Sequence, residues 1–308
     1  MPRPSAEATI RACRGKPLLH VVATLLTVVS LAHAEDIKIP APHIGDEKTL
    51  RAQWFTPAKD KATGAAAILL HGCGGLGANR KLNARHAAAK DWLIERGIAV
   101  VFPESFTSRR FEEVCTVKFQ SRTITQRDRV DDVKAAHLWL RDQPAVDAKK
   151  IVLWGWSHGG GTTLATLTQQ IGETFSDDVK FAQTIAFYPG CSSYAASARP
   201  PKISSPLALF IGEADDWTPA APCETWVKRL REYKQDATIT TYSGAFHDFD
   251  NPAGKLRVRN EVPNGVNLGK GVTVGPDSKA RDDAMKRIDA LLRERGLIAA
   301  KPVLEKTP

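Results

Sequence analysis

A serine set among glycines is the residue best suited to covalent chemistry. The segment GWSHGG, residues 155–160, contains the pattern G-x-S-x-G, in which a serine on a sharp strand-to-helix turn presents its hydroxyl as a nucleophile. An apolar run, residues 151–156, leads into Ser157, and a glycine-rich helix start follows it, so the surroundings match the pattern. A serine that only caps the following helix is the alternative interpretation.

A serine hydroxyl is a weak nucleophile unless a base takes its proton. His247 is the candidate base, because it follows the last predicted strand directly, where a loop histidine can reach across the strand ends. An ordinary surface histidine is the alternative. Other histidines fit less well, because they lie in an irregular region, at a strand end, in predicted helices or beside the serine: His43, His71, His86, His137 and His158.

The base in turn needs a carboxylate to hold its tautomer. Residues 209–219, LFIGEADDWTP, read as a strand that runs into an acidic turn. Asp215 is the preferred candidate, and Asp216 and Glu213 are the alternatives. The chain order serine, aspartate, histidine is that of α/β-hydrolases and differs from the orders of the chymotrypsin and subtilisin types.

A glycine-rich loop could supply the oxyanion hole that acyl transfer requires. HGCGGL, residues 71–76, follows an apolar strand, and we expect the backbone N–H groups of Cys73 and His158 to be the donors. The loop lacks the G-K-[ST] ending of a phosphate-binding loop and the spacing of a dinucleotide fingerprint. We therefore expect neither a cofactor nor a metal site.

Apolar stretches alternate with helical patterns along most of the chain, which favours a largely parallel sheet with helices on both faces. Without a linker of proline, glycine and serine, a single domain is expected, and residues 251–276 read as a long loop. The predicted strands cover residues 50–55, 65–71, 98–102, 151–156, 181–188, 207–212 and 238–242, and the predicted helices residues 83–96, 123–142, 160–170, 220–234 and 278–295.

The N-terminus has the pattern of a secretory signal: basic residues, an apolar run over residues 18–31, and the small-x-small site Ala32-His33-Ala34. We predict cleavage after Ala34, a mature domain of residues 35–308, and a periplasmic or secreted location. An uncleaved membrane anchor is the alternative, although the run is shorter than a span needs. No later segment is expected to cross a membrane.

The charge of the chain argues against a nucleic-acid-binding protein. The formal charge of +9 falls to +6 once the predicted leader removes four basic residues and one acidic residue, and the remaining excess is scattered. Without a basic stripe interleaved with aromatic side chains, nucleic-acid binding is not expected. The pattern says nothing about oligomeric state.

Four segments together resemble the dienelactone hydrolase-like branch of the α/β-hydrolases: HGCGGL, GWSHGG, GEADDWTP and GAFHDFD. The resemblance covers about residues 60–295 and implies an eight-stranded, mostly parallel sheet and hydrolysis of ester-type bonds. Carried over by motif, Ser157, Asp215 and His247 form the triad, and Cys73 and His158 supply the oxyanion donors. The founding type of the family has a cysteine in place of Ser157 and a glutamate in place of Gly72.

Four cysteines remain after the predicted cleavage, and an even number in an exported protein suggests two disulfides with three possible pairings. The fold implied by the resemblance places Cys73 near Cys115 and Cys191 near Cys223. The first bridge would hold the oxyanion loop, and the second would brace the turn of Asp215. Four free buried thiols are the alternative.

The sequence as a whole predicts an exported serine hydrolase that cleaves small carboxylic esters or lactones through an acyl-enzyme. A peptidase or acyltransferase on the same triad is one alternative, and a non-catalytic binding protein of the cell envelope is another. Four aromatic side chains could line an acyl pocket or simply belong to the core: Phe106, Trp156, Trp217 and Phe246. Arg109 and Arg110 could meet an anionic substrate group or form a solvated pair.

Overall fold

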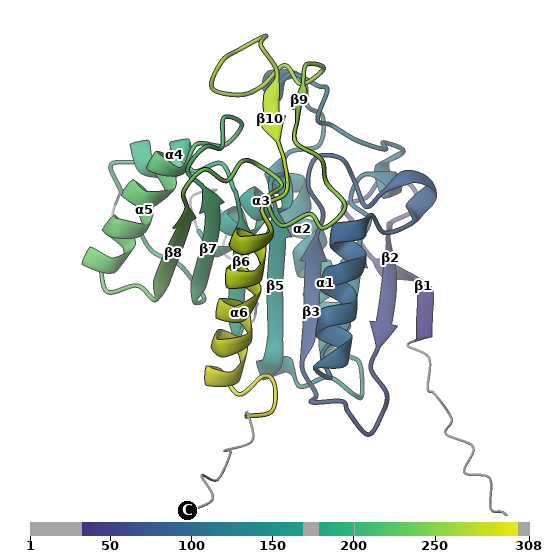
Figure 1. The fold of residues 1–308 in the computed structure, drawn as a ribbon. Helices are drawn as coiled ribbons and strands as arrows, with labels where there is room; N and C mark the ends of the chain where they lie inside the picture. The colour runs from purple at the N-terminus through teal and green to yellow at the C-terminus, as the bar shows by residue number, and fades with distance from the viewer. Residues whose placement is uncertain (1–32, 169–178, 200, 301–308) are drawn as a thin grey trace, which may run out of the picture. The chain divides into compact units, whose positions relative to one another are not determined.

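The computed structural model describes residues 33–168, 179–199 and 201–300, which belong to the compact unit Ala32–Pro308 (Figure 1). Its main sheet has eight strands in the order β1-β2-β4-β3-β5-β6-β7-β8. β1 and β4 both run antiparallel to β2, and every pair from β4 through to β8 is parallel. The predicted class, an eight-stranded and mostly parallel α/β-hydrolase sheet, is confirmed.

The strands of the main sheet are β1 (His33–Pro40), β2 (Thr49–Thr56), β3 (Ala66–Leu70), β4 (Ala99–Pro103), β5 (Ile151–Trp156), β6 (Gln183–Phe187), β7 (Leu207–Gly212) and β8 (Ala237–Tyr242). A separate two-stranded sheet pairs β9 (Arg257–Arg259) with β10 (Val272–Val274). The helices are α1 (Ala84–Glu95), α2 (Gln126–Arg141), α3 (His158–Leu167), α4 (Ser192–Ala196), α5 (Ala220–Glu232) and α6 (Ser278–Glu294).

Helices cover both faces of the main sheet because its central strands are apolar on both sides. α1 and α6 lie side by side on one face (Figure 1), where Arg96 pairs with Asp289 at 2.9 Å. α2 covers the other face and packs Val133 and Leu140 into the same cluster as Leu153 of β5. β5 is buried along its whole length, so it carries the following turn on a rigid support.

Helix starts follow local capping chemistry. Asn83 caps α1 by accepting the N–H of His86, and Thr125 forms a reciprocal capping box with Asp128 at the start of α2. α2 therefore begins at Gln126, three residues later than the pattern predicted. α3 begins two residues before its predicted start, and its predicted end at residue 170 lies outside the described residues.

Residues 251–276 are not one unbroken loop, so that expectation is wrong. The triplets RVR and VTV pair as β9 and β10, and the glycine- and asparagine-rich residues around them conceal such short strands. Asp216 anchors the pair by accepting the backbone N–H and the hydroxyl of Thr273, both at 2.7 Å. β1 and α4 were also missed.

Both disulfides implied by the resemblance are present, Cys73–Cys115 and Cys191–Cys223. The expected cleavage point after Ala34 falls inside β1, and most of the predicted leader lies outside the described residues, so the leader stays a prediction. Within the described ranges, no helix is long and apolar enough to span a membrane.

Candidate active site

Ser157 occupies a strained turn between β5 and α3. Its backbone has φ 52° and ψ −114°, a left-handed region that non-glycine residues rarely enter. Two neighbouring glycines make the turn possible: a Cβ added at Gly155 would lie 2.2 Å from the carbonyl oxygen of Gly159, and one added at Gly159 would lie 2.2 Å from that of Leu70. The turn raises Ser157 above the carboxyl end of β5, as the pattern predicted.

His247 and Asp215 meet at the same edge of the sheet. His247 follows β8 and Asp215 follows β7, and Nδ1 of the imidazole lies 2.7 Å from Oδ2 of the carboxylate. Both side chains are buried. The backbone N–H groups of Trp217 and Thr218 donate to the other carboxylate oxygen, Oδ1, at 2.9 and 2.8 Å. This geometry can fix the orientation and tautomer of the imidazole.

The two alternative acids lie elsewhere. Asp216 holds Thr273 of β10, and Glu213 is exposed to solvent. Of these three acids, Asp215 is the one that lies within hydrogen-bond distance of His247, at 2.7 Å.

The imidazole of His247 lies between two aromatic rings, with centroid separations of 4.4 Å to Tyr188 and 4.6 Å to Trp217. Its Nε2 is buried and has no hydrogen-bond partner among the described residues, so no bond joins it to the Ser157 hydroxyl in this structure. Ser157 lines a cavity together with Trp217 and Thr218, both of which contact His247. Catalytic hydrogen bonds are often long in unliganded enzymes and tighten on substrate binding.

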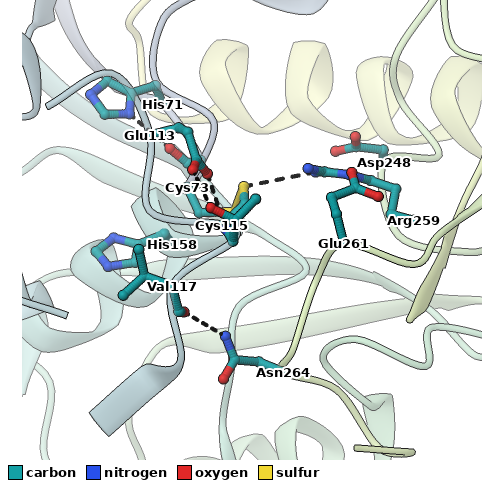
Figure 2. Close-up of a disulfide and its surroundings, with 12 residues drawn as sticks. His71, Cys73, Glu113, Cys115, Val117, His158, Asp248, Arg259, Glu261 and Asn264 are labelled. Carbon is teal, nitrogen blue, oxygen red and sulfur yellow. Dashed lines mark hydrogen bonds and ion pairs between the residues drawn. A yellow bond between two sulfur atoms is a disulfide. The ribbon is translucent and has the colours of Figure 1, made fainter. Parts of the chain in front are cut away.

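The predicted oxyanion loop, residues 71–76, follows β3 and is held by contacts from other segments (Figure 2). The carbonyl oxygen of Cys73 accepts the N–H of Val114 at 2.8 Å, and the Cys73–Cys115 disulfide links the same two segments. Cys73, Ser157 and His158 all line the same cavity. A Cβ added at Gly72 would lie 3.4 Å from Cβ of Ser157, which is about van der Waals contact, so a side chain at this position would begin directly against the serine.

The cavity at Ser157 has a volume of about 140 Å³ and shares walls with a larger one of about 720 Å³. The side chains that both cavities share were not predicted, apart from Trp217 and His158, and include Phe119, Arg122 and Gln126. Burial lowers the pKa of Arg122, while the nearby Glu113 opposes that shift. Their position in the segment after β4 is the signal that could have predicted these side chains, since loops at the carboxyl ends of parallel strands line binding sites in this class of sheet.

Other predicted pocket residues have different positions. Trp156 is fully buried and donates its indole N–H to Asp250 at 2.7 Å, while Phe106 is buried beneath the oxyanion loop against His71. Phe246 is half-buried and is absent from the lining of both cavities. Trp217 is therefore the one member of the predicted aromatic set that lines the cavity at Ser157.

The two arginines considered for substrate contact do not line these cavities. Arg109 makes a two-point ion pair with the buried carboxylate of Asp132, with both N–O distances at 2.9 Å. Arg110 is exposed. Arg122 is the arginine that lines both cavities.

The β9–β10 pair and its loops join the segments that carry the site. A β-bridge links His247 to Val274, and the Asn264 side chain bonds the backbone of Val117 and Phe119 at 3.0 and 2.9 Å. Arg259 directs a guanidinium N–H toward Sγ of Cys115 at 3.7 Å (Figure 2). Residues 251–276 therefore connect the loop of His247 to the Cys73–Cys115 disulfide.

A buried polar network holds the Tyr188 ring that packs against the imidazole of His247. Asp250 accepts hydrogen bonds from the Tyr188 hydroxyl at 2.6 Å and from Trp156, and Arg85 pairs with Asp248 and donates to Tyr188 at 2.8 Å. Burial raises the pKa of Asp250, although the charge of Arg85 opposes this. The network fixes the Tyr188 ring that packs against His247. Among the described residues, no cluster of three or more potential metal ligands occurs.

The fold and these motif positions define an α/β-hydrolase. A model of the dienelactone hydrolase family matches residues 50–295, and the chain belongs to that family. Its fold is similar to that of Thermogutta terrifontis esterase 2 phosphorylated by paraoxon, with a TM-score of 0.61, 20% identity, and coverage of 87% of this chain and 96% of that one. A dienelactone hydrolase-like promiscuous phosphotriesterase, P91, from metagenomic libraries has a TM-score of 0.61 at 16% identity, over 87% of this chain and 99% of that one.

A shorter similarity links the chain to a probable dipeptidyl-aminopeptidase B from Arthroderma gypseum. The two are 41% identical over 70 residues, which is 23% of this chain and 7% of that relative. A match to the corresponding protein of Trichophyton verrucosum is 40% identical over 70 residues, with the same shares of the two chains. The chain therefore matches under a tenth of the length of these curated relatives.

Proposed function

We propose that this hydrolase is an exported serine esterase that cleaves carboxylic esters or lactones through an acyl-enzyme. The observation that carries the proposal is the pairing of His247 with Asp215 at 2.7 Å, beside a cavity into which the strained turn of Ser157 opens. A serine, a carboxylate and an imidazole in this chain order are the groups that acyl transfer through a nucleophilic hydroxyl requires.

In the proposed reaction, Oγ of Ser157 attacks the substrate carbonyl carbon while His247 Nε2 takes the hydroxyl proton. The unpartnered state of Nε2 among the described residues leaves it available for this bond once substrate is present. Asp215 holds the proton on Nδ1 and stabilises the imidazolium as it forms. The backbone N–H groups of Cys73 and His158 receive the developing oxyanion.

The tetrahedral intermediate collapses when His247 returns its proton to the leaving alcohol oxygen, which leaves an acyl group on Ser157. A water molecule then repeats the sequence: His247 takes a proton from the water, the resulting hydroxide attacks the acyl carbon, and the proton returns to Oγ of Ser157. Atoms balance as ester plus water giving acid plus alcohol.

Two features favour esters over peptides. The family match covers residues 50–295, whereas the peptidase similarity covers 70 residues. The structural neighbours named above are an esterase and a phosphotriesterase, which share the fold at 20% identity or less. The acyltransferase alternative needs a separate experiment, in which water, alcohols and amines compete for the acyl group and the products distinguish hydrolysis from acyl transfer.

Export is supported by the two disulfides, because such bonds persist in oxidising compartments. The leader at residues 1–34 remains a prediction from the sequence. Mass measurement of the mature protein recovered from a secreting host tests it: we expect an N-terminus at Glu35, and a retained leader would contradict the proposal.

The test of function compares the wild-type chain with Ser157→Ala on p-nitrophenyl esters, lactones and p-nitroanilide peptides. We expect ester or lactone turnover in the wild type, and a decrease of about 10⁵-fold or more in the variant with unchanged thermal unfolding. Ester turnover retained by Ser157→Ala would move the nucleophile elsewhere. Cleavage of the anilides alone would favour the peptidase alternative.

A further inference from the structure

Arg129 of α2 is a fully buried arginine directly behind the turn that carries the nucleophile. Its Nη1 donates to Nδ1 of His158 at 3.0 Å, and its Nε donates to the Ser105 hydroxyl at 3.2 Å. The guanidinium lies over the ring of Phe106, 5.2 Å from the ring centroid. Its Nη2 has no hydrogen-bond partner among the described residues.

Within the part of the chain that the structure describes, this guanidinium makes no hydrogen bond to a carboxylate. Asp132 is the carboxylate whose charge acts on Arg129. Its oxygens already accept two hydrogen bonds of 2.9 Å from Arg109, and His43 Nε2 lies 2.8 Å from one of them. Burial lowers the pKa of Arg129 to about 9, with Asp132 opposing the shift and Arg109 adding to it. The group therefore stays cationic at neutral pH, which is a costly arrangement in a protein interior.

The cation lies next to both segments that hold the proposed oxyanion donors. His158 is the first residue of α3 and carries one donor, while His71 opens the loop that carries Cys73. Phe106 packs between them, with ring centroids 4.6 Å from His71 and 5.8 Å from His158. Burial and the charge of Arg129 both lower the pKa of His71 and of His158, so both imidazoles are neutral.

A neutral His158 that accepts from Arg129 at Nδ1 must carry its own proton at Nε2. This fixes the tautomer of the side chain and restrains the start of α3, where the backbone N–H groups have no partners within the helix. The positive end of the helix dipole and the guanidinium then act in the same direction on any negative charge beside Ser157.

We propose that Arg129 is a positioning residue of the oxyanion hole: it fixes His158 and supplies a buried positive charge that stabilises the tetrahedral oxyanion formed on Ser157. The inference rests on the proposed function, because it assumes that Ser157 is the nucleophile. Arg129 does not touch the substrate. Its charge is present before the reaction begins, so it stabilises the transition state without rearrangement.

The test uses an aryl trifluoromethyl ketone, whose carbonyl carbon bonds to Oγ of Ser157 while the serine proton passes to His247. The adduct is a hemiketal whose ionised oxygen occupies the oxyanion hole, and ¹⁹F NMR reports its pKa directly. A merely structural role for Arg129 would not move that pKa.

Arg129→Met removes the charge and keeps an apolar side chain of similar reach. We expect kcat to fall roughly 10- to 100-fold with KM within about threefold, and the pKa of the bound hemiketal to rise by about one to two. The matched control is Arg141→Met, which removes an exposed charge from the same helix and should change neither value. An unchanged hemiketal pKa in folded Arg129→Met overturns the inference.

Arg129→Lys keeps the proposal testable if the methionine variant does not fold. A buried ammonium loses its proton far more readily than a guanidinium. Between pH 7 and 10.5, we therefore expect the affinity of this variant for the ketone to decrease with rising pH more steeply than the affinity of the wild type. The ionisable neighbours are common to both proteins, so superimposable profiles would contradict the inference; these neighbours are His43, His71, His86, His158, Arg109 and Asp132.

Failure of the inference and failure of the proposed function give different results. If Ser157→Ala retains turnover, the nucleophile is wrong and both fall. If Ser157→Ala is inactive while Arg129→Met keeps the wild-type kcat and hemiketal pKa, only the role of Arg129 is refuted.

Discussion

The two disulfides form a matched pair for testing how the oxyanion loop is held. They close segments of similar length, with sequence separations of 42 residues for Cys73–Cys115 and 32 for Cys191–Cys223. In the chain-entropy model, loops of these lengths each correspond to about 4 kcal/mol of stability. Removing either bridge by a double alanine substitution should therefore lower the free energy of unfolding by a similar amount.

Their positions relative to the site differ. Cys73 carries a proposed oxyanion donor, its carbonyl oxygen accepts from Val114, and Cys115 contacts Arg259. Cys191 and Cys223 instead join the start of α4 to α5. The turn of Asp215 beside them is also held by its own hydrogen bonds from Trp217 and Thr218, so it does not depend on this bridge alone.

The Cys73→Ala/Cys115→Ala protein should lose about 10- to 100-fold in kcat, because a loosened loop misplaces one donor of the oxyanion hole. KM should stay within about threefold. The Cys191→Ala/Cys223→Ala protein should keep kcat within about threefold despite its similar loss of stability. Steady-state kinetics on a p-nitrophenyl ester, run well below both unfolding midpoints, measure this, and equal kcat values for the two double variants would refute the reasoning.

Three further predictions concern the carboxylate of Asp215, the turn of Ser157 and the buried side chain of His86. Asp215→Asn should lower kcat by about 10³- to 10⁴-fold, whereas Asp216→Asn should mainly disturb the β9–β10 pair; comparable kcat losses would contradict the assignment. Gly159→Ala should destabilise the fold by more than about 3 kcal/mol in denaturant titrations, since its Cβ would lie 2.2 Å from a carbonyl oxygen, and wild-type stability would argue against the turn described above.

The third concerns His86, whose pKa burial lowers to about 3, with the charge of Arg85 adding to the shift. The unfolded chain binds this proton near the ordinary pKa of histidine and the folded chain does not, so stability falls as pH falls between about 6.5 and 3. His86→Gln should reduce that slope by about 1.4 kcal/mol per pH unit, and denaturant midpoints with the wild-type slope would contradict the account.

The fold could largely be predicted from the sequence, because buried strands of a parallel sheet are short apolar runs. β5 and β7 have the predicted bounds, and most helices differ by one to three residues at an end, where capping side chains decide the start. β9 and β10 could not be predicted in this way. Each has three residues, and their position depends on Asp216 and His247 from distant segments.

In the candidate site, too, local features could be predicted from the sequence and contacts between distant residues could not. The motifs around Ser157, Asp215 and His247 are local, so their spacing and chain order were visible. Contacts such as those between Arg129 and His158, or Asn264 and Phe119, join residues 29 and 145 positions apart, and nothing near either partner marks them. Its position beside a motif left open whether Trp156 lines a pocket or belongs to the core, and the structure packs it in the core of the sheet.

The most direct test of the central claim is to trap the covalent intermediate. Wild-type enzyme mixed with p-nitrophenyl acetate and quenched in acid within milliseconds should gain one acetyl group, which peptide mass spectrometry should locate on Ser157, and His247→Ala should gain none on that time scale. Turnover of the ester with no acyl group on Ser157, or with the group on another residue, would contradict the account.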